Sequence, residues 1–357
     1  MDREFPDVTV GTGRDTEGVT DDWDAFNADL LPWRRLGYRD PSSRTERERL
    51  REQVLDQVEG ADSLADLLPW RRLGRRNPSS RTERERLREQ VLDQVEGADP
   101  LADPGWVVTL AGDWHGDAGW AGHAAEQAAA IGSRLIVQLG DFGVWPGSTG
   151  EGYLDAVEAE CRRHGVTVLF IDGNHEDFDR LARYPVAPCG LRPVRPSVWH
   201  LPRGTRWVWR GRVWLAVGGA VSVDRAMRTP GATWWRQETL KPDEAEAIIA
   251  GGPADIMVTH DRPVMAQIAL GERPGAWHAR GLANGWARED LCAADAHSAL
   301  LQTVVDAAQP TRLFHGHMHD RYDTLVDPAS WGGACRVTGL DQQGAPGNLL
   351  HFPLPTS

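Results

Sequence analysis

Apolar positions are distributed differently before and after residue 104 of the chain. Beyond this point, short runs of apolar residues alternate with stretches in which apolar side chains recur at helical spacing. The runs predict buried strands and the spaced stretches predict helices. Strands are expected at 106–112, 134–140 and 166–173, with helices at 121–132 and 153–165 between them. Alternation of this kind indicates an α/β domain built in layers.

A second group of apolar runs follows further along the chain. Residues 205–220 predict a hairpin that turns at Arg210 and Gly211, and residues 254–260 predict another strand. Four later runs are expected to complete this second set of strands: 311–317, 321–326, 335–340 and 348–352. The predicted fold class is therefore α/β, with two packed mixed β-sheets flanked by helices.

The first 103 residues carry a repeat, in which a charged segment that begins at Ala28 recurs almost letter for letter from Ala65. Each copy predicts one helix with a narrow apolar stripe. Such a stripe is too narrow for an independent core, so we expect a solvated, partly helical tail or a contact surface for a protein partner. The expected organisation is a disordered N-terminus over 1–27, a tandem duplicated helical arm over 28–103 and the main domain over 104–357.

Composition and charge limit the classes of function. The chain is 41% hydrophobic and 25% charged, which is ordinary for a globular protein. Its formal net charge of -13 disfavours broad nucleic-acid binding unless a local basic patch overrides it, and an anionic substrate would need local cations. No run approaches the roughly 20 apolar residues of a membrane span, and the first residues lack the features of a signal peptide. We therefore expect a cytoplasmic protein without membrane contact.

Polar clusters follow directly on the predicted strands. The first three strands lead into GDWHG with Asp113 and His115, LGDFG with Asp141, and DGNHE with Asn174 and His175. Two later strands lead into VTHD and HGHMH, which supply three further histidines: His260, His317 and His319. Ligands bind outside the carboxyl ends of the strands in open α/β sheets, so we expect these clusters to converge on one rim.

The residue types in these clusters suit divalent transition metals. Carboxylate, carboxamide and imidazole ligands together fit Mn, Fe, Zn or Ni, and the lack of thiolates disfavours a structural zinc site. Two ions held about 3.5–4 Å apart need a bridging carboxylate and several ligands each. The clusters contain enough donors for two ions.

Five blocks, GDWHG, GD, GNHE, a lone strand-end histidine and GHMH, occur in an order that resembles the calcineurin-like metallophosphoesterases of bacterial and phage type, from about Gly105 to Phe352. The resemblance implies a four-layer sandwich and a metal-dependent phosphoric-ester hydrolase, in which a hydroxide that bridges two metal ions attacks a phosphomonoester or phosphodiester. It also assigns the site residues block by block: Asp113, His115 and His319 to the first metal, Asn174, His260 and His317 to the second, Asp141 as the bridge, and His175 as a catalytic histidine that is not a ligand.

The substrate class is less defined than the chemistry. The arginine that follows the second block in the eukaryotic-type protein phosphatases is missing, since the chain reads GDFGVWPG there. Small phosphodiesters or nucleotides are therefore favoured over phosphoproteins, and both monoesters and diesters stay open. We expect residues 264–296 to form a lid at which the substrate is selected.

Two alternative functions compete with a small-molecule phosphoesterase. A nuclease-like phosphodiesterase would need a basic groove, for which the arginines between Arg192 and Arg212 are the densest supply. A catalytically silent scaffold would act through the duplicated arm, but every ligand block is intact, which disfavours this reading.

Overall fold

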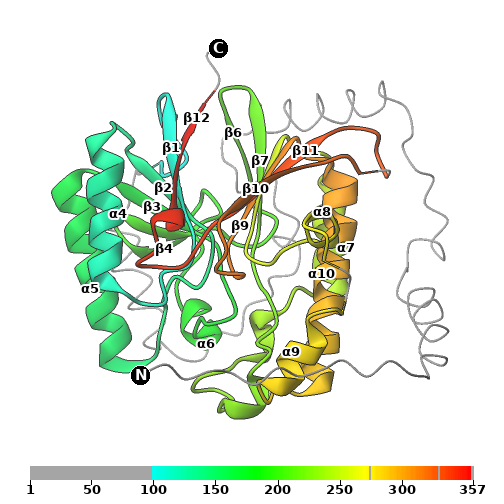
Figure 1. Ribbon diagram of the computed structural model, residues 1–357. Coiled ribbons are helices and arrows are strands. Elements are labelled where there is room, and N and C mark those ends of the chain that lie inside the picture. The colour runs from blue at the N-terminus through cyan, green and yellow to red at the C-terminus, as the bar shows by residue number, and fades with distance from the viewer. Residues whose placement is uncertain (1–98, 273–274, 329, 355–357) are drawn as a thin grey trace, which may run out of the picture. The chain divides into compact units, whose positions relative to one another are not determined.

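The computed structural model describes residues 99–272, 275–328 and 330–354. The expected disordered N-terminus and nearly all of the expected duplicated arm lie outside these residues. Within them, the chain forms two six-stranded sheets that pack face to face, with helices over both outer faces (Figure 1). The expected fold class, two mixed sheets flanked by helices, is confirmed.

The first sheet has the strand order β12-β1-β2-β3-β5-β4. Its four inner strands run parallel, and an antiparallel strand closes each edge. The strands span β1 Val107–Ala111, β2 Leu135–Gln138, β3 Thr167–Phe170, β4 Arg192–Arg195, β5 Val198–His200 and β12 Leu349–Pro353.

The second sheet repeats this plan with the strand order β10-β11-β9-β8-β7-β6. Four parallel strands again lie between two antiparallel edge strands. The strands span β6 Arg206–Trp209, β7 Arg212–Val217, β8 Ile256–Thr259, β9 Arg312–His315, β10 Tyr322–Val326 and β11 Cys335–Gly339.

Helices cover the outer face of each sheet (Figure 1). The first sheet carries α4 (Ala118–Ala130) and α5 (Gly147–His164), and the second carries α7 (Pro242–Ala250), α8 (Val264–Ala269) and α10 (Arg288–Ala308). Shorter helices lie in the connections: α6 Phe178–Leu181, α9 His278–Ala283, and the 3₁₀ turns η4 Arg225–Met227, η5 Arg236–Glu238 and η6 Pro346–Asn348. No helix within the described residues is both long enough and apolar enough to cross a membrane.

Successive residues of the inner strands face different cores. In β2, Val137 lies in the core between the two sheets, whereas Ile136 packs toward α4 and α5. In β8, Val258 faces the other sheet and Met257 packs toward α7 and α10. Both faces of each sheet are therefore dry, which explains why these strands read as continuous apolar runs in the sequence.

The strands predicted from apolar runs are present, and the hairpin turns at Arg210 and Gly211, whose φ angles are 52° and 66°. One placement was wrong. β12 was expected in the second set of strands, but it pairs antiparallel with β1 in the first sheet, with Val108 opposite Phe352. A strand pattern does not specify a partner, and the free edge of β1 is the edge that this segment covers.

Two further expectations from the sequence concern the domain boundary at residue 104 and the lid over residues 264–296. Leu101, three residues before the predicted boundary at residue 104, is buried, and its carbonyl accepts a hydrogen bond from Trp209 Nε1 at 2.9 Å. The division of the chain into an arm and a main domain stays a prediction. Residues 264–296, expected as a lid, contain α8, α9 and the start of α10, and α10 packs against α7 and α8. Part of this segment therefore belongs to the helical layer of the second sheet, and its role as a lid stays a prediction.

Candidate metal centre

The strand-end clusters meet at one rim of the two sheets. Asp113 follows β1, Asp141 follows β2 and Asn174 follows β3, which are neighbouring parallel strands of the first sheet. His260 follows β8 and His317 follows β9, which are parallel neighbours in the second sheet. Each sheet thus brings the carboxyl ends of its parallel strands, with their polar residues, to the shared rim, as the sequence predicted.

The backbone is unusual at this rim. Six non-glycine residues in the described part of the chain have positive φ, and four of them are predicted ligands: His115 (42°), Asp141 (52°), His317 (64°) and His319 (50°). The left-handed region is costly for residues with a Cβ atom, and such strain persists mainly where the surrounding structure enforces it at functional sites. The fold therefore holds these side chains in fixed directions at some cost in stability.

Two glycines allow the loops to approach the carboxylates closely. A Cβ atom on Gly173 would overlap the side chain and backbone of Asp141, and one on Gly316 would overlap a carboxylate oxygen of Asp113. Steric crowding therefore explains why glycine occupies these positions in DGNHE and HGHMH, independently of turn geometry.

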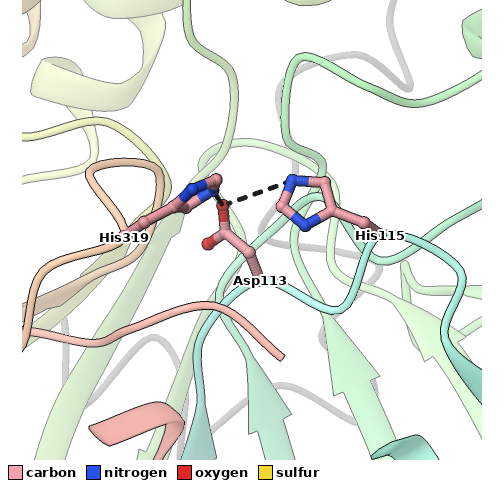
Figure 2. Close-up of side chains that lie close together, drawn as sticks. All are labelled: Asp113, His115 and His319. Carbon is pink, nitrogen blue, oxygen red and sulfur yellow. Dashed lines mark hydrogen bonds and ion pairs between the residues drawn. The ribbon is translucent and has the colours of Figure 1, made fainter. Parts of the chain in front are cut away.

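A first cluster consists of Asp113, His115 and His319, whose rings lie on either side of the carboxylate (Figure 2). His319 Nε2 is 3.0 Å and His115 Nε2 is 3.9 Å from Asp113 Oδ2. One donor atom from each of the three residues lies within 4.8 Å of the others, a spacing that can hold a metal ion. Asp113 is fully buried, whereas the His319 side chain is 37% exposed.

A second cluster consists of Asp141, His260 and His317, with Asn174 beside it. His260 Nε2 lies 3.5 Å from Asp141 Oδ1 and 3.2 Å from Asn174 Oδ1. The His260 and His317 rings are 5.0 Å apart between centroids. His260 is fully buried, so this cluster is deeper in the protein than the first.

Asp141 lies between the two clusters. Its Oδ2 is 3.3 Å from His115 Nε2 of the first cluster, and its Oδ1 is 3.5 Å from His260 Nε2 of the second. The backbone N–H groups of Trp114 and His115 also donate to the Asp141 carbonyl, which ties the two loops together. The two carboxylate oxygens of Asp141 therefore face different clusters.

Hydrogen bonds on the outer nitrogen orient two of the predicted imidazole ligands. Nδ1 of His115 lies 2.8 Å from Gln343 Oε1, and Nδ1 of His260 lies 2.7 Å from the Leu139 carbonyl. Both partners accept hydrogen bonds, so each ring carries its proton on Nδ1 and presents Nε2 to the centre. This arrangement is typical of histidines that bind metal ions.

A relay of hydrogen bonds orients Asn174 in the same way. Asn174 Nδ2 donates to Ser222 Oγ at 3.0 Å, and Ser222 Oγ donates to the buried carboxylate of Glu238 at 2.7 Å. The amide nitrogen is therefore turned outward and the amide oxygen faces His260. Carboxamide oxygen is the atom that can bind a metal ion.

Glu176, which follows His175 in the DGNHE motif, has a structural role. Glu176 accepts hydrogen bonds from the backbone N–H groups of Phe142, Gly143 and Val144 and thereby fixes the loop after Asp141. Burial, followed by the charge of Asp141, raises the pKa of Glu176 to about 7.

Asp261, beside His260, orients a histidine that the motifs do not include. Its Oδ2 accepts from His297 Nδ1 at 2.7 Å, and His297 Nε2 accepts from the backbone N–H of Leu240. Burial opposes ionisation of Asp261, but the hydrogen bond from His297 lowers its pKa to about 2.

The carboxylates attract protons to the surrounding imidazoles. Burial lowers the pKa of His115, but Asp141 and Asp113 outweigh burial and raise it to about 9. The same two carboxylates outweigh burial at His260 and raise its pKa to about 10. Burial lowers the pKa of His317 to about 4. The centre thus has a strong local preference for positive charge, which either protons or metal ions can satisfy.

His175 lies beside Asp141 on the outer side of the centre. Its backbone N–H donates to Asp141 Oδ1 at 2.8 Å, and its Nε2 is 3.8 Å from Asp141 Oδ2. It also forms a group of metal-compatible spacing with His115 and Asp141, so geometry alone does not separate it from the ligands. Burial lowers the pKa of His175, against the charge of Asp141 and with that of Arg228.

Arg228 was not anticipated from the sequence. Its Nη1 lies 2.7 Å from His175 Nδ1, and its Nε and Nη2 donate to Asp224 at 2.6 and 2.7 Å. Arg228 and Asp224 lie in the connection between β7 and α7, whose sequence has no periodic pattern and no motif. Gln343, Ser222 and Glu238 were missed for the same reason, since only the folded chain brings these loops to the rim.

His315 and the arginines considered for a basic groove make contacts outside the candidate metal centre. His315, which the sequence left out of the site, is buried and hydrogen-bonded to Tyr322 and to the Gly316 carbonyl, and burial lowers its pKa to about 4. Each arginine considered for a basic groove contacts an acidic side chain or a backbone carbonyl: Arg192, Arg195, Arg203, Arg206, Arg210 and Arg212. These contacts give no support to a nucleic-acid groove.

Comparison with known proteins adds distant likenesses. No protein-family profile matches the sequence, and no curated protein matches it. Among solved structures, the protein TT1561 of Thermus thermophilus is similar with a TM-score of 0.40 and 13% identity, over 66% of this chain and 89% of that protein. A dimetal phosphatase from Danio rerio is similar with a TM-score of 0.37 and 14% identity, over 67% of this chain and 88% of that chain.

Proposed function

We propose that this protein is a metal-dependent phosphoesterase with a dinuclear centre. The observation that carries the proposal is the convergence of seven predicted ligands from five strand ends on one rim, with Asp141 between two clusters of donor atoms. Structural histidines and aspartates do not need to converge in this way, because each can be satisfied by hydrogen bonds to its own separate partners.

The residues at the rim fit two divalent ions. Asp113, His115 and His319 would hold one ion, Asn174, His260 and His317 would hold the other, and Asp141 would bridge them. The fit rests on the mixed oxygen and imidazole donors, on Nε2 atoms turned inward by bonds to Gln343 and Leu139, and on loops held in left-handed conformations. When bound, the ions would supply an activated water and cancel charge on a phosphoryl group.

His175 has a different task in this proposal. The Arg228 guanidinium donates to His175 Nδ1, which leaves the proton of the neutral ring on Nε2, the nitrogen nearer to Asp141. From there His175 Nε2–H can donate a hydrogen bond to a leaving-group oxygen. Because its pKa is lowered, the neutral ring is the form that acts near neutral pH.

The experiment combines metal analysis with a panel of phosphoesters. Protein stripped with a chelator should lose hydrolysis, and Mn or a similar transition metal should restore it. His175→Ala should retain metal and lose roughly 10²–10⁴-fold in rate on esters with poor leaving groups. The matched control is His123→Ala, which removes an exposed imidazole on α4. Full hydrolysis by metal-free protein would contradict the proposal.

A further inference from the structure

The contact between Arg228 and His175 pairs two guanidinium nitrogens with an imidazole that can accept only one hydrogen bond. Two atoms of the guanidinium face the imidazole, with Nη1 2.7 Å from Nδ1 and Nη2 3.4 Å from Nε2. A neutral imidazole accepts at one nitrogen and donates at the other. Once Nη1–H has donated to Nδ1, the ring proton is on Nε2, so the Nη2 N–H that faces Nε2 at 3.4 Å has no acceptor on the ring.

The rest of the guanidinium is fixed by its own loop. Its Nε and Nη2 make a bidentate pair with Asp224, and its Nη1 also donates to the Thr233 carbonyl at 3.2 Å. The neighbouring Arg225 forms an ion pair with Asp290, a buried residue on α10, and lies over the Trp234 ring. Arg228 is thus held against His175 by contacts on both sides of the loop, and its side chain is 20% exposed.

We infer that Arg228 binds a non-ester oxygen of a phosphoryl group beside His175, and that the substrate is a phosphomonoester. An anionic non-ester oxygen accepts from the Nη2 N–H of the guanidinium, while His175 Nε2–H stays available to the leaving-group oxygen. The position suits this role because His175 Nε2 is 3.8 Å from Asp141 Oδ2, at the edge of the proposed metal centre.

The preference for a monoester follows from counting oxygens, and it rests on the proposed function. A phosphomonoester has three non-ester oxygens, whereas a phosphodiester has two. Two ions can engage two of these oxygens, which leaves one for Arg228 only in the monoester.

The test uses the full-length, metal-loaded protein with two esters that share a leaving group, p-nitrophenyl phosphate and bis(p-nitrophenyl) phosphate. Arg228→Ala should lower kcat/KM roughly 10- to 100-fold for the monoester and less than about threefold for the diester. Arg228→Lys, which keeps the charge but loses the planar fork, should recover only a minor part. Arg163→Ala, which removes an exposed cation on α5, is the matched control.

Inorganic phosphate, titrated into the same proteins by calorimetry, gives a readout that does not depend on turnover. Arg228→Ala should weaken its binding roughly 10- to 100-fold while the metal content stays unchanged. If Arg228 only orients His175, the variant will lower kcat for both esters and leave phosphate affinity intact, and the inference is overturned. If the wild-type protein hydrolyses neither ester, the proposed function is wrong, and the phosphate titration alone then decides the role of Arg228.

Discussion

The two ligand clusters of the centre differ in how far they are buried. Asp141 and His260 of the second cluster are buried, whereas His115 and His319 of the first are 19% and 37% exposed. Their orienting groups differ in the same direction. The Leu139 carbonyl that fixes His260 belongs to the core, and Gln343 that fixes His115 is half-buried in a loop. We expect the buried cluster to hold its ion tightly and the exposed cluster to exchange its ion readily.

The largest effect is expected at Asp141, which belongs to both sides of this comparison. Asp141→Asn keeps the size of the side chain and tolerates its positive φ, but it removes the charge that two ions would share. Both sites should weaken, and hydrolysis should fall by roughly 10³-fold or more. Metal content by mass spectrometry checks this. Two tightly held ions in the variant would contradict the bridging role.

A direct comparison of the clusters is given by His260→Ala and His319→Ala. Each should remove one ion, but only His260→Ala leaves a cavity in a fully buried position. Its free energy of unfolding, measured by urea denaturation of chelated protein, should fall by about 2–4 kcal/mol, against less than about 1 kcal/mol for His319→Ala. Equal losses of stability would show that the difference in burial has no energetic consequence.

Smaller effects are expected from the residues that orient the ligands. Gln343→Ala should weaken the exposed site and Ser222→Ala the buried site, each about 10- to 100-fold in metal affinity. The two variants should act on different ions, which competition with a fluorescent chelator can resolve as separate binding steps. Gln342→Ala removes the same type of side chain next in sequence and should leave both steps unchanged.

The last prediction concerns the pH dependence of the stability of chelated protein. The raised pKa values of His115 and His260, about 9 and about 10, mean that these groups bind protons more tightly in the folded than in the unfolded chain, where the value is about 6.5. Their contribution to the stability of chelated protein is fully present below about pH 6.5 and is lost as pH rises through 9–10. Urea melts of the chelated protein should therefore show a lower free energy of unfolding at pH 10 than at pH 6.5 from this source. The difference should shrink in His260→Ala.

Much of the site could be predicted because the ligands are attached to strands. A buried parallel strand is readable as an apolar run, and the residue that follows it must emerge at the rim, so Asp113, Asp141 and Asn174 were placed by local pattern alone. Arg228 and Gln343 could not be found in this way. They lie on connections whose path depends on the packing of the whole chain, and neither has a periodic neighbourhood.

The fold was predictable to a similar extent. The strands 192–195 and 198–200 were missed because residues 192–200 contain two prolines and two arginines, a composition typical of a loop. The helix α10 was not predicted, although the apolar spacing of Leu301, Val304 and Val305 is a usable helical signal. The pairing of β12 with β1 could not be predicted, because the sequence does not show which sheet edge is free.

The pairing of β12 with β1 has a consequence for the order of events during biosynthesis. Asn348 Nδ2 donates to the Asp113 carbonyl across 235 positions of sequence, and Gln343 reaches His115 across 228. At translation rates of 5–20 residues per second, roughly 10–50 s separate the synthesis of the two sides of these contacts. During that interval Asp113 and His115 are already made but not yet oriented. The loop that carries Asp113 and His115 can therefore reach its final orientation only after the segment from Gln343 to Asn348 has been made.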